Sequence, residues 1–377
     1  MAMKMRTATA KWTAGFACAL LLASPGALAK KKRKQKFAPY QPRLELVWPG
    51  PPEKPRIRFI REIRSSEDVT GQYKPSFVER ITGKSTRRRL LRLVKPYGVA
   101  VDRAGRVFVA DMAQRAILIF DLPNETVTRW TGNSQFPLFL PASLAFDQFG
   151  RLFVTDAFAG RMVVFDPNGR PSAGFGTGLF ERPGGVAIDR VRNRLYVADV
   201  KRNQVLVFDT QSFQLIQEIG HRRQEGSDEP GEFAGPTNVA VDREGNLYVA
   251  DTWNRRVQVF GPDGRFLRTF GTVGVQPGNF VRPKGIAVDS EGHIYVLDAE
   301  FNNFQIFDPD GQPLLFVGSF GVRPGQFILP TGIAIDNEDR IYVVEQGFDA
   351  NPARLQVFQY LSQPDVASAA TREPERR

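Results

Sequence analysis

The sequence is poor in cysteine and histidine, with one Cys and two His among 377 residues. Cysteine-based zinc sites, iron–sulfur clusters and haem attachment need several such ligands, so these classes are excluded, as is a cysteine nucleophile. Intrinsic disorder is excluded as well, because 42% of the residues are apolar and only 24% are charged. The chain is therefore a globular protein whose chemistry does not depend on thiols.

The positive charge of the chain is concentrated at its N-terminal end. Residues 1–95 contain 23 Lys and Arg against 6 Asp and Glu, a net charge of +17, whereas residues 96–377 contain 28 against 34, a net charge of −6. A nucleic-acid-binding body would carry a basic surface of its own. Single-stranded nucleic acid is therefore a disfavoured partner.

Residues 1–29 have the form of a secretory signal. Basic residues precede an apolar run over residues 12–22, and residues 25–29, Pro-Gly-Ala-Leu-Ala, end in a pattern that signal peptidase accepts. We expect cleavage after Ala29 and export to the periplasm or the extracellular space. The basic run that follows opposes translocation, and a retained segment would leave the protein associated with a membrane.

Residues 30–55 form a basic, proline-rich arm in this interpretation. The run from Lys30 to Lys36 contains six Lys and Arg residues. A solvated tail is the simpler reading of this run, and an electrostatic contact with an anionic membrane surface is the alternative.

A short pattern recurs six times from residue 96 onward. Each copy begins at a proline, continues through an apolar run and ends at an aspartate, as in residues 236–242, Pro-Thr-Asn-Val-Ala-Val-Asp; the copies begin at residues 96, 141, 183, 236, 283 and 330. Intervals of 20–50 residues are typical of repeat architectures. Within each unit, short β-branched runs alternate with glycine-containing turns, which predicts a four-stranded antiparallel sheet. Six such sheets hide their edges by closing into an all-β, six-bladed β-propeller.

Two recurring residue types have structural explanations. The aspartate that ends each first strand is expected to form a turn rather than to act as a catalyst, with glycines such as Gly105 and Gly245 supplying a positive φ. A phenylalanine shortly before four of the repeats is expected to wedge between neighbouring blades; these residues are Phe180, Phe233, Phe280 and Phe327.

Residues 236–260 closely resemble the NHL repeat, and the resemblance extends over about residues 96–361. It implies a six-bladed β-propeller, here interpreted as a secreted bacterial type. Two units depart from the pattern. Ser143 replaces a glycine in the second unit, and Glu345 replaces in the sixth unit an aspartate that the other five share.

The last unit lacks a fourth strand. Residues 56–63, Arg-Ile-Arg-Phe-Ile-Arg-Glu-Ile, alternate charged and apolar side chains, and we predict that they supply the missing outer strand of the last blade. A connector over residues 64–95 follows, in which a capping box at residues 76–79 predicts a short helix. Residues 362–377 are expected to form a disordered tail.

The channel face is the predicted binding surface, because loops that enter the first strands and loops that join the second and third strands meet there. Candidate residues for binding a protein partner or a small ligand come from both sets of loops; they are Tyr97, Arg115, Arg161, Arg202, Asn238, Trp253, Asn254, Arg256, Lys284 and Asn303.

Three functional classes are compatible with these features. A noncatalytic binding scaffold at the cell envelope, with no cofactor, is the preferred interpretation. The alternative is a calcium-dependent lactonase or hydrolase, although Lys284 would oppose a cation. A zinc lyase is disfavoured because His221 and His293 are expected on different faces. Single-stranded nucleic-acid binding is the third class.

Overall fold

The computed structural model describes residues 45–71, 90–225, 228–348 and 352–362. The expected signal, residues 30–44 of the arm, the capping box at 76–79 and the tail beyond residue 362 lie outside these ranges. None of the helices found within them has the length and apolar character needed to cross a membrane.

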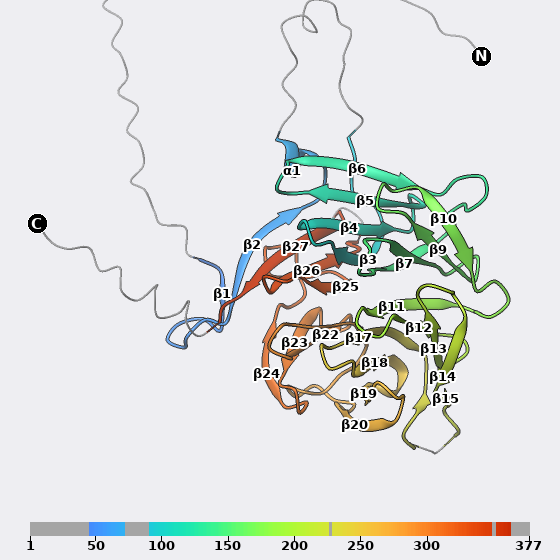
Figure 1. Cartoon of the computed structure of the whole chain (residues 1–377). Helices are drawn as coiled ribbons and strands as arrows, with labels where there is room; N and C mark the ends of the chain where they lie inside the picture. Colours follow the sequence, from blue (N-terminus) through green and yellow to red (C-terminus); the bar gives the residue numbers. More distant parts are fainter. Residues whose placement is uncertain (1–44, 72–89, 226–227, 349–351, 363–377) are drawn as a thin grey trace, which may run out of the picture. The chain divides into compact units, whose positions relative to one another are not determined.

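Six antiparallel sheets surround a central axis, as the repeat predicts (Figure 1). Blade 1 contains β3 (Pro96–Val101), β4 (Arg106–Asp111), β5 (Ala116–Asp121) and β6 (Thr126–Thr131). Blade 2 contains β7 (Pro141–Phe146), β8 (Leu152–Asp156), β9 (Arg161–Phe165) and β10 (Pro171–Phe175). Blade 3 contains β11 (Pro183–Asp189), β12 (Arg194–Asp199), β13 (Gln204–Asp209) and β14 (Leu215–Ile219).

The second half of the ring repeats this arrangement. Blade 4 contains β17 (Pro236–Val241), β18 (Leu247–Asp251), β19 (Arg256–Phe260) and β20 (Phe266–Phe270). Blade 5 contains β21 (Pro283–Val288), β22 (Ile294–Asp298), β23 (Asn303–Phe307) and β24 (Pro313–Val317). Blade 6 contains β25 (Pro330–Ile335), β26 (Arg340–Glu345) and β27 (Arg354–Tyr360) from the C-terminal end of the chain.

The N-terminal strand closes the ring, as predicted. Strand β2 (Ile57–Ile63) pairs antiparallel with β27, so that Ile57 lies opposite Tyr360 and Ile63 opposite Leu355. In Figure 1 the blue β2 and the red β27 lie side by side, although they come from opposite ends of the chain. A fifth strand that the sequence did not predict, β1 (Val47–Trp48), pairs with β2 and makes blade 6 five-stranded.

Short elements occupy the connections between strands. The connector contains the four-residue helix α1 (Glu67–Thr70). A 3₁₀ turn, η1 (Thr252–Asn254), joins β18 to β19. The loop between blades 3 and 4 contains the small parallel pair β15 (His221–Arg222) and β16 (Glu232–Phe233).

The core consists of six apolar clusters, one at each contact between neighbouring blades. Phe233, for example, is fully buried in the cluster between blades 3 and 4, and Phe280 is fully buried in the next cluster. The predicted role of these phenylalanines as wedges is therefore confirmed. Every blade depends on both of its neighbours for burial of its apolar faces.

The aspartates at the ends of the first strands form turns, as predicted. Oδ1 of Asp102 accepts hydrogen bonds from the backbone N–H groups of Ala104 and Arg106, both at 2.9 Å. Gly105 in this turn has a φ of 76°, a value that a side chain would disfavour. These carboxylates are used to fold each hairpin and are not directed toward the channel.

Candidate functional site: the mouth of the central channel

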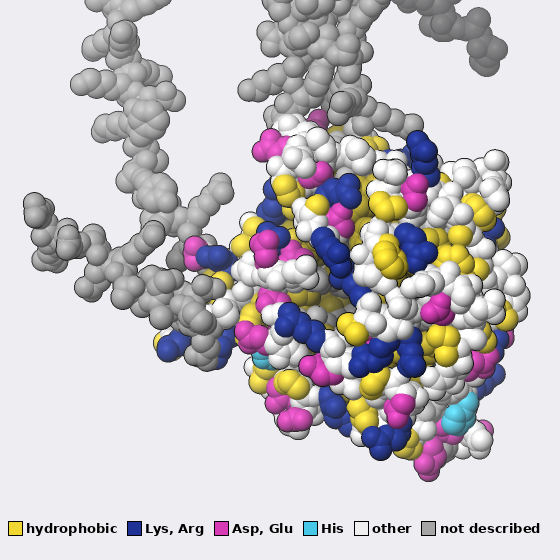
Figure 2. Space-filling model, viewed as in Figure 1, with side chains coloured by type: hydrophobic (Ala, Val, Ile, Leu, Met, Phe, Trp, Pro, Cys, Tyr) yellow, Lys and Arg dark blue, Asp and Glu magenta, His cyan; other side chains and the backbone are white. Residues whose placement is uncertain are grey.

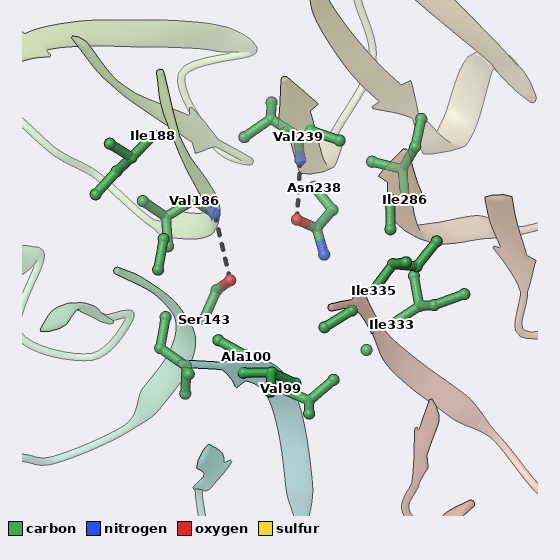
Figure 3. Close-up of a pocket in the computed structure, with 18 of the residues that line it drawn as sticks. Val99, Ala100, Ser143, Val186, Ile188, Asn238, Val239, Ile286, Ile333 and Ile335 are labelled. Carbon is green, nitrogen blue, oxygen red and sulfur yellow. Dashed lines mark hydrogen bonds between the residues drawn. The ribbon is translucent and has the colours of Figure 1, made fainter. Parts of the chain in front are cut away.

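The six first strands line a central cavity of about 190 Å³. Its walls are mainly Val, Ile and Ala side chains, such as Val99, Val186 and Ile333, which Figure 3 shows pointing inward. Because apolar walls give little orientation to a ligand, the chemistry of this cavity depends on the few polar groups near its ends.

Asn238 is the polar side chain that enters the cavity most clearly (Figure 3). Its Oδ1 accepts a hydrogen bond from the backbone N–H of Val239 at 2.9 Å, which leaves the amide N–H₂ group directed to the cavity. A Cβ atom on Gly185 would lie 2.1 Å from this Oδ1, so the glycine of the neighbouring blade makes the room for Asn238. Ser143 is instead occupied by the backbone, since its Oγ accepts a hydrogen bond from Val186 N–H at 3.3 Å.

We use the term channel mouth for the end of this cavity at which Tyr97, Arg182, Asn238 and Lys284 gather. Lys284 is the second residue of β21 and Tyr97 the second residue of β3, so blade 6 lies between them. Nζ of Lys284 nevertheless lies 5.6 Å from the centre of the Tyr97 ring. The lysine therefore extends across the mouth.

Hydrogen bonds between blades fix the backbone at this position. The hydroxyl of Thr237 donates to the carbonyl of Lys284 at 3.1 Å, and the hydroxyl of Thr252 donates to the carbonyl of Pro283 at 2.7 Å. These bonds join blade 4 to blade 5. The lysine is thus carried by a rigid strand rather than by a loose loop.

The electrostatic environment shifts the pKa of both residues. Desolvation lowers the pKa of the Lys284 amine, and the charges of Arg282 and Arg182 lower it further. Burial raises the pKa of the Tyr97 phenol, against a smaller opposite effect of Arg182. The mouth therefore shifts the Lys284 amine toward its neutral form and keeps the Tyr97 phenol protonated, which suits the pair to accept and to donate a proton.

Arg182 supplies a positive charge at the same mouth. The carboxylate of Asp199 accepts hydrogen bonds from the backbone N–H groups of Glu181 and Arg182, at 2.7 and 3.0 Å, and so holds the segment that leads into β11. Within the part of the chain that the structure describes, the Arg182 guanidinium has no ion-pair partner. An anionic group of a ligand could therefore bind it without displacing an internal acid.

Three of these four residues are among the candidates that the sequence predicted. Tyr97, Asn238 and Lys284 were predicted because they follow the proline at which a first strand starts. Arg182 was missed, although an Arg-Pro pair precedes two first strands, at 182–183 and 282–283. This repeated Arg-Pro pair is the signal that could have indicated a basic mouth.

Other predicted residues lie away from the mouth and have internal partners. Arg256 is buried, and its guanidinium binds Asp251, Asp228 and the carbonyl of Glu232. Arg202 pairs with Glu218 at 3.1 Å. The remaining two with such bonds are Arg161, which donates to the carbonyl of Pro137, and Asn254, which donates to Asp251.

The last three predicted residues are dispersed. Arg115 is exposed in the β4–β5 loop, and Asn303 is the half-buried first residue of β23. Trp253 is 60% exposed and lines a separate groove of about 460 Å³ with Arg222.

Figure 2 shows that Lys and Arg side chains surround the middle of the visible face, with apolar side chains between them.

The channel does not fit a divalent cation. Calcium prefers several carboxylate or carbonyl oxygens, whereas Asn238 presents an N–H₂ group and Lys284 a cation or amine. No group of three or more His, Cys, Asp or Glu side chains placed to hold a metal occurs among the described residues. His221 lies in β15 and His293 beside Asp289, so neither is a channel ligand.

Comparisons with known proteins match this architecture. The NHL repeat model matches residues 180–208, 233–260 and 280–307, so the chain contains NHL repeats. A structure of a streptogramin B lyase aligns with a TM-score of 0.54 at 11% identity, over 71% of this chain and 94% of that one. This likeness shows the shared propeller fold.

Two curated relatives are enzymes by name. The chain is 37% identical over 113 residues to peptidyl-glycine alpha-amidating monooxygenase B of Xenopus laevis, which covers 29% of this chain and 13% of the relative. It is 34% identical over 94 residues to a probable peptidyl-alpha-hydroxyglycine alpha-amidating lyase of Caenorhabditis elegans, which covers 25% of this chain and 26% of the relative. The matched part is thus about a quarter or less of each relative.

These relatives correct the preferred functional interpretation. The prediction of a noncatalytic scaffold is contradicted, because several similar proteins carry the names of amidating enzymes, one of them a lyase.

Proposed function

We propose that this propeller is an enzyme of the lyase class that acts at the channel mouth on a substrate with a carboxylate group. The placement of Nζ of Lys284 5.6 Å from the centre of the Tyr97 ring carries the proposal, because it brings a candidate base and a candidate acid together. The similarity to two amidating enzymes supports the reaction class.

The name of the lyase relative suggests a first substrate to consider. A peptidyl-α-hydroxyglycine has a hydroxylated carbon between an amide nitrogen and a carboxylate. Arg182 would bind the carboxylate, since it is a cation without an ion-pair partner among the described residues. The N–H₂ group of Asn238 would donate to the amide carbonyl of the peptide.

The proton transfers involve the Lys284 amine as the base and the Tyr97 phenol as the acid. The neutral amine of Lys284 accepts the proton of the substrate hydroxyl, whose oxygen forms the C=O bond of an aldehyde. The bond from that carbon to the amide nitrogen breaks, and its electron pair goes to the nitrogen. The Tyr97 phenol donates a proton to this nitrogen, which releases a peptide amide and glyoxylate. Proton exchange with solvent restores both side chains.

The first test is release of glyoxylate from N-benzoyl-α-hydroxyglycine by the full chain. We expect Lys284→Met to reduce kcat about 100-fold or more, because it removes the base. Arg182→Gln should mainly raise KM by weakening carboxylate binding. Because the base is the neutral amine, kcat/KM should rise with pH up to the pKa of Lys284 and then level.

The matched control is Lys201→Met. It removes an exposed lysine of the β12–β13 loop, which pairs with Glu181. This variant should keep the wild-type rate. Absence of glyoxylate release above the buffer rate by the wild-type chain would refute the proposed reaction. Full activity of Lys284→Met would refute the assigned base.

A further inference from the structure

A second cavity lies where the ring closes, and it is separate from the channel mouth. Its volume is about 650 Å³, compared with about 190 Å³ for the channel, and this is within the usual range for small-molecule sites. Three parts of the chain line it: residues 49–56 before β2, Tyr360 in β27, and blade 5 around His293. We call it the seam pocket.

His293 occupies a position in the repeat at which three other blades have an arginine. Four residues after the turn aspartate, blades 1, 2 and 6 have Arg106, Arg151 and Arg340, whose Nε atoms lie 2.6–2.7 Å from the aspartate. In blade 5 the imidazole takes this place, and its Nδ1 lies 3.0 Å from Oδ2 of Asp289. The shorter side chain leaves space where an arginine would extend.

The contact with Asp289 determines the state of the imidazole. It raises the pKa of His293, and Glu291 acts in the same direction, whereas burial and the charge of Arg56 oppose it. Since Nδ1 faces Asp289, Nε2 is the nitrogen left for a ligand. A carboxylate in the seam pocket could therefore receive a hydrogen bond from the protonated ring.

Two further cationic side chains of the seam pocket are available to a ligand. In the described ranges, neither Lys54 nor Arg56 has an ion-pair partner. Of the two acids, Glu291 accepts a hydrogen bond from the Tyr360 hydroxyl at 3.3 Å, and Glu53 is exposed in the segment before β2. The remaining phenol near this site, Tyr295, donates to Asp289 at 3.0 Å.

An apolar wall faces these groups. Ile306 of β23 is buried, and Leu314 and Leu315 of β24 line the same cavity. Leu314 is 54% exposed, so part of its side chain is open to a ligand. The seam pocket thus combines a cationic part with an apolar part.

We propose that the seam pocket binds a small organic carboxylate with an apolar tail. Arg56 and the His293 ring hold the carboxylate, and the tail lies against Ile306 and Leu314. The pocket is complete only when β2 is paired with β27, so the ligand binds the closed ring in preference to the open one and stabilises the closure. This binding is independent of the reaction proposed at the channel mouth.

Calorimetric titration of the full chain with octanoate at pH 6 and pH 8 tests the proposal. We expect saturable one-to-one binding that is weaker at pH 8, because His293 loses its proton as the pH rises. Arg56→Gln should weaken binding at pH 6 about tenfold, as expected for loss of one charge-assisted hydrogen bond. His293→Gln should remove the difference between the two pH values.

Two controls make the outcome specific. Arg340→Gln changes the same repeat position in blade 6. Because Arg340 does not line the pocket, this variant should bind octanoate like the wild type. Octylammonium has the same tail with the opposite charge and should not bind. The proposal is overturned if octanoate shows no saturable binding at pH 6, if both pocket variants bind it unchanged, or if octylammonium binds more tightly.

Discussion

At the residue scale, one glutamine in each of the last three blades fixes the loop that leads into its blade. In blade 5, Oε1 of Gln305 accepts the N–H of Gly278 and its Nε2 donates to the carbonyl of Asn279, both at 2.8 Å. Gln258 in blade 4 and Gln356 in blade 6 make the corresponding bonds. The loops before these first strands are therefore held by side chains and not only by the sheet.

Loss of this glutamine should be costly. Gln305 is 3% exposed, so Gln305→Leu would leave a backbone N–H and a carbonyl without their partner. We expect a loss of about 2 kcal/mol in the free energy of unfolding, measured by urea denaturation. Gln276→Leu, at an exposed position of the same loop, should change it by less than about 0.5 kcal/mol. Equal effects of the two substitutions would contradict this role of Gln305.

At the element scale, β2 is the strand on which ring closure depends. Its first and last residues, Ile57 and Ile63, are fully buried, while Ile60 in the middle is 43% exposed. An ion pair adds to the strand pairing, since Arg354 at the start of β27 binds Glu62 at 2.8 Å and the buried Glu345 at 2.5 Å. The strand is thus anchored by packing at both ends and by a charge near one of them.

Two isoleucines of this strand provide a matched comparison. Ile57→Ala should lower the free energy of unfolding by about 3 kcal/mol, because it leaves a cavity in the cluster between blades 5 and 6. Ile60→Ala should lower it by less than about 1 kcal/mol, since this side chain is already partly in water. Chemical denaturation of both variants checks the difference. A similar loss in the two variants would mean that β2 contributes no specific packing to the ring.

At the scale of the whole molecule, the closed ring is a circular series of interfaces, each with its own apolar cluster. Opening one interface exposes apolar surface and also the free edge of a strand. Free edges pair with other chains, so closure protects the molecule against association as well as against unfolding.

Truncation tests this dependence on closure. A chain that begins at residue 64 lacks β1 and β2, and we expect a lower Tm and association through the exposed edge of β27. A chain that begins at residue 45 keeps both strands and serves as the control. Thermal denaturation and size-exclusion chromatography measure the two effects. A monomeric 64–377 chain with the Tm of the control would show that the ring does not need its N-terminal strand.

The sequence predicted the features that depend on local patterns. The proline, the apolar run and the turn aspartate of each unit act within a few residues, so the blades, the wedges and the closing strand were predictable. The same local pattern identified Tyr97, Asn238 and Lys284 at the starts of first strands.

Features that depend on distant contacts were not predicted. Arg256 was expected on the binding surface, but Asp228 and Glu232 in the preceding loop bind its guanidinium. Strand β1 has only two residues and is followed by a proline-rich stretch without alternation, so no periodicity indicated its pairing. The proximity of Lys284 to Tyr97 depends on the ring geometry that brings blades 5 and 1 to one mouth.

The pairing of β2 with β27 has a consequence for synthesis of the chain. Ile63 leaves the ribosome long before Arg354, and 354 − 63 = 291 residues separate them. At about 5–20 residues per second, the first strand waits roughly 15 to 60 seconds for its partner. During this interval its two buried isoleucines lack the native residues against which they pack. The nascent chain therefore needs protection from non-native contacts until translation ends.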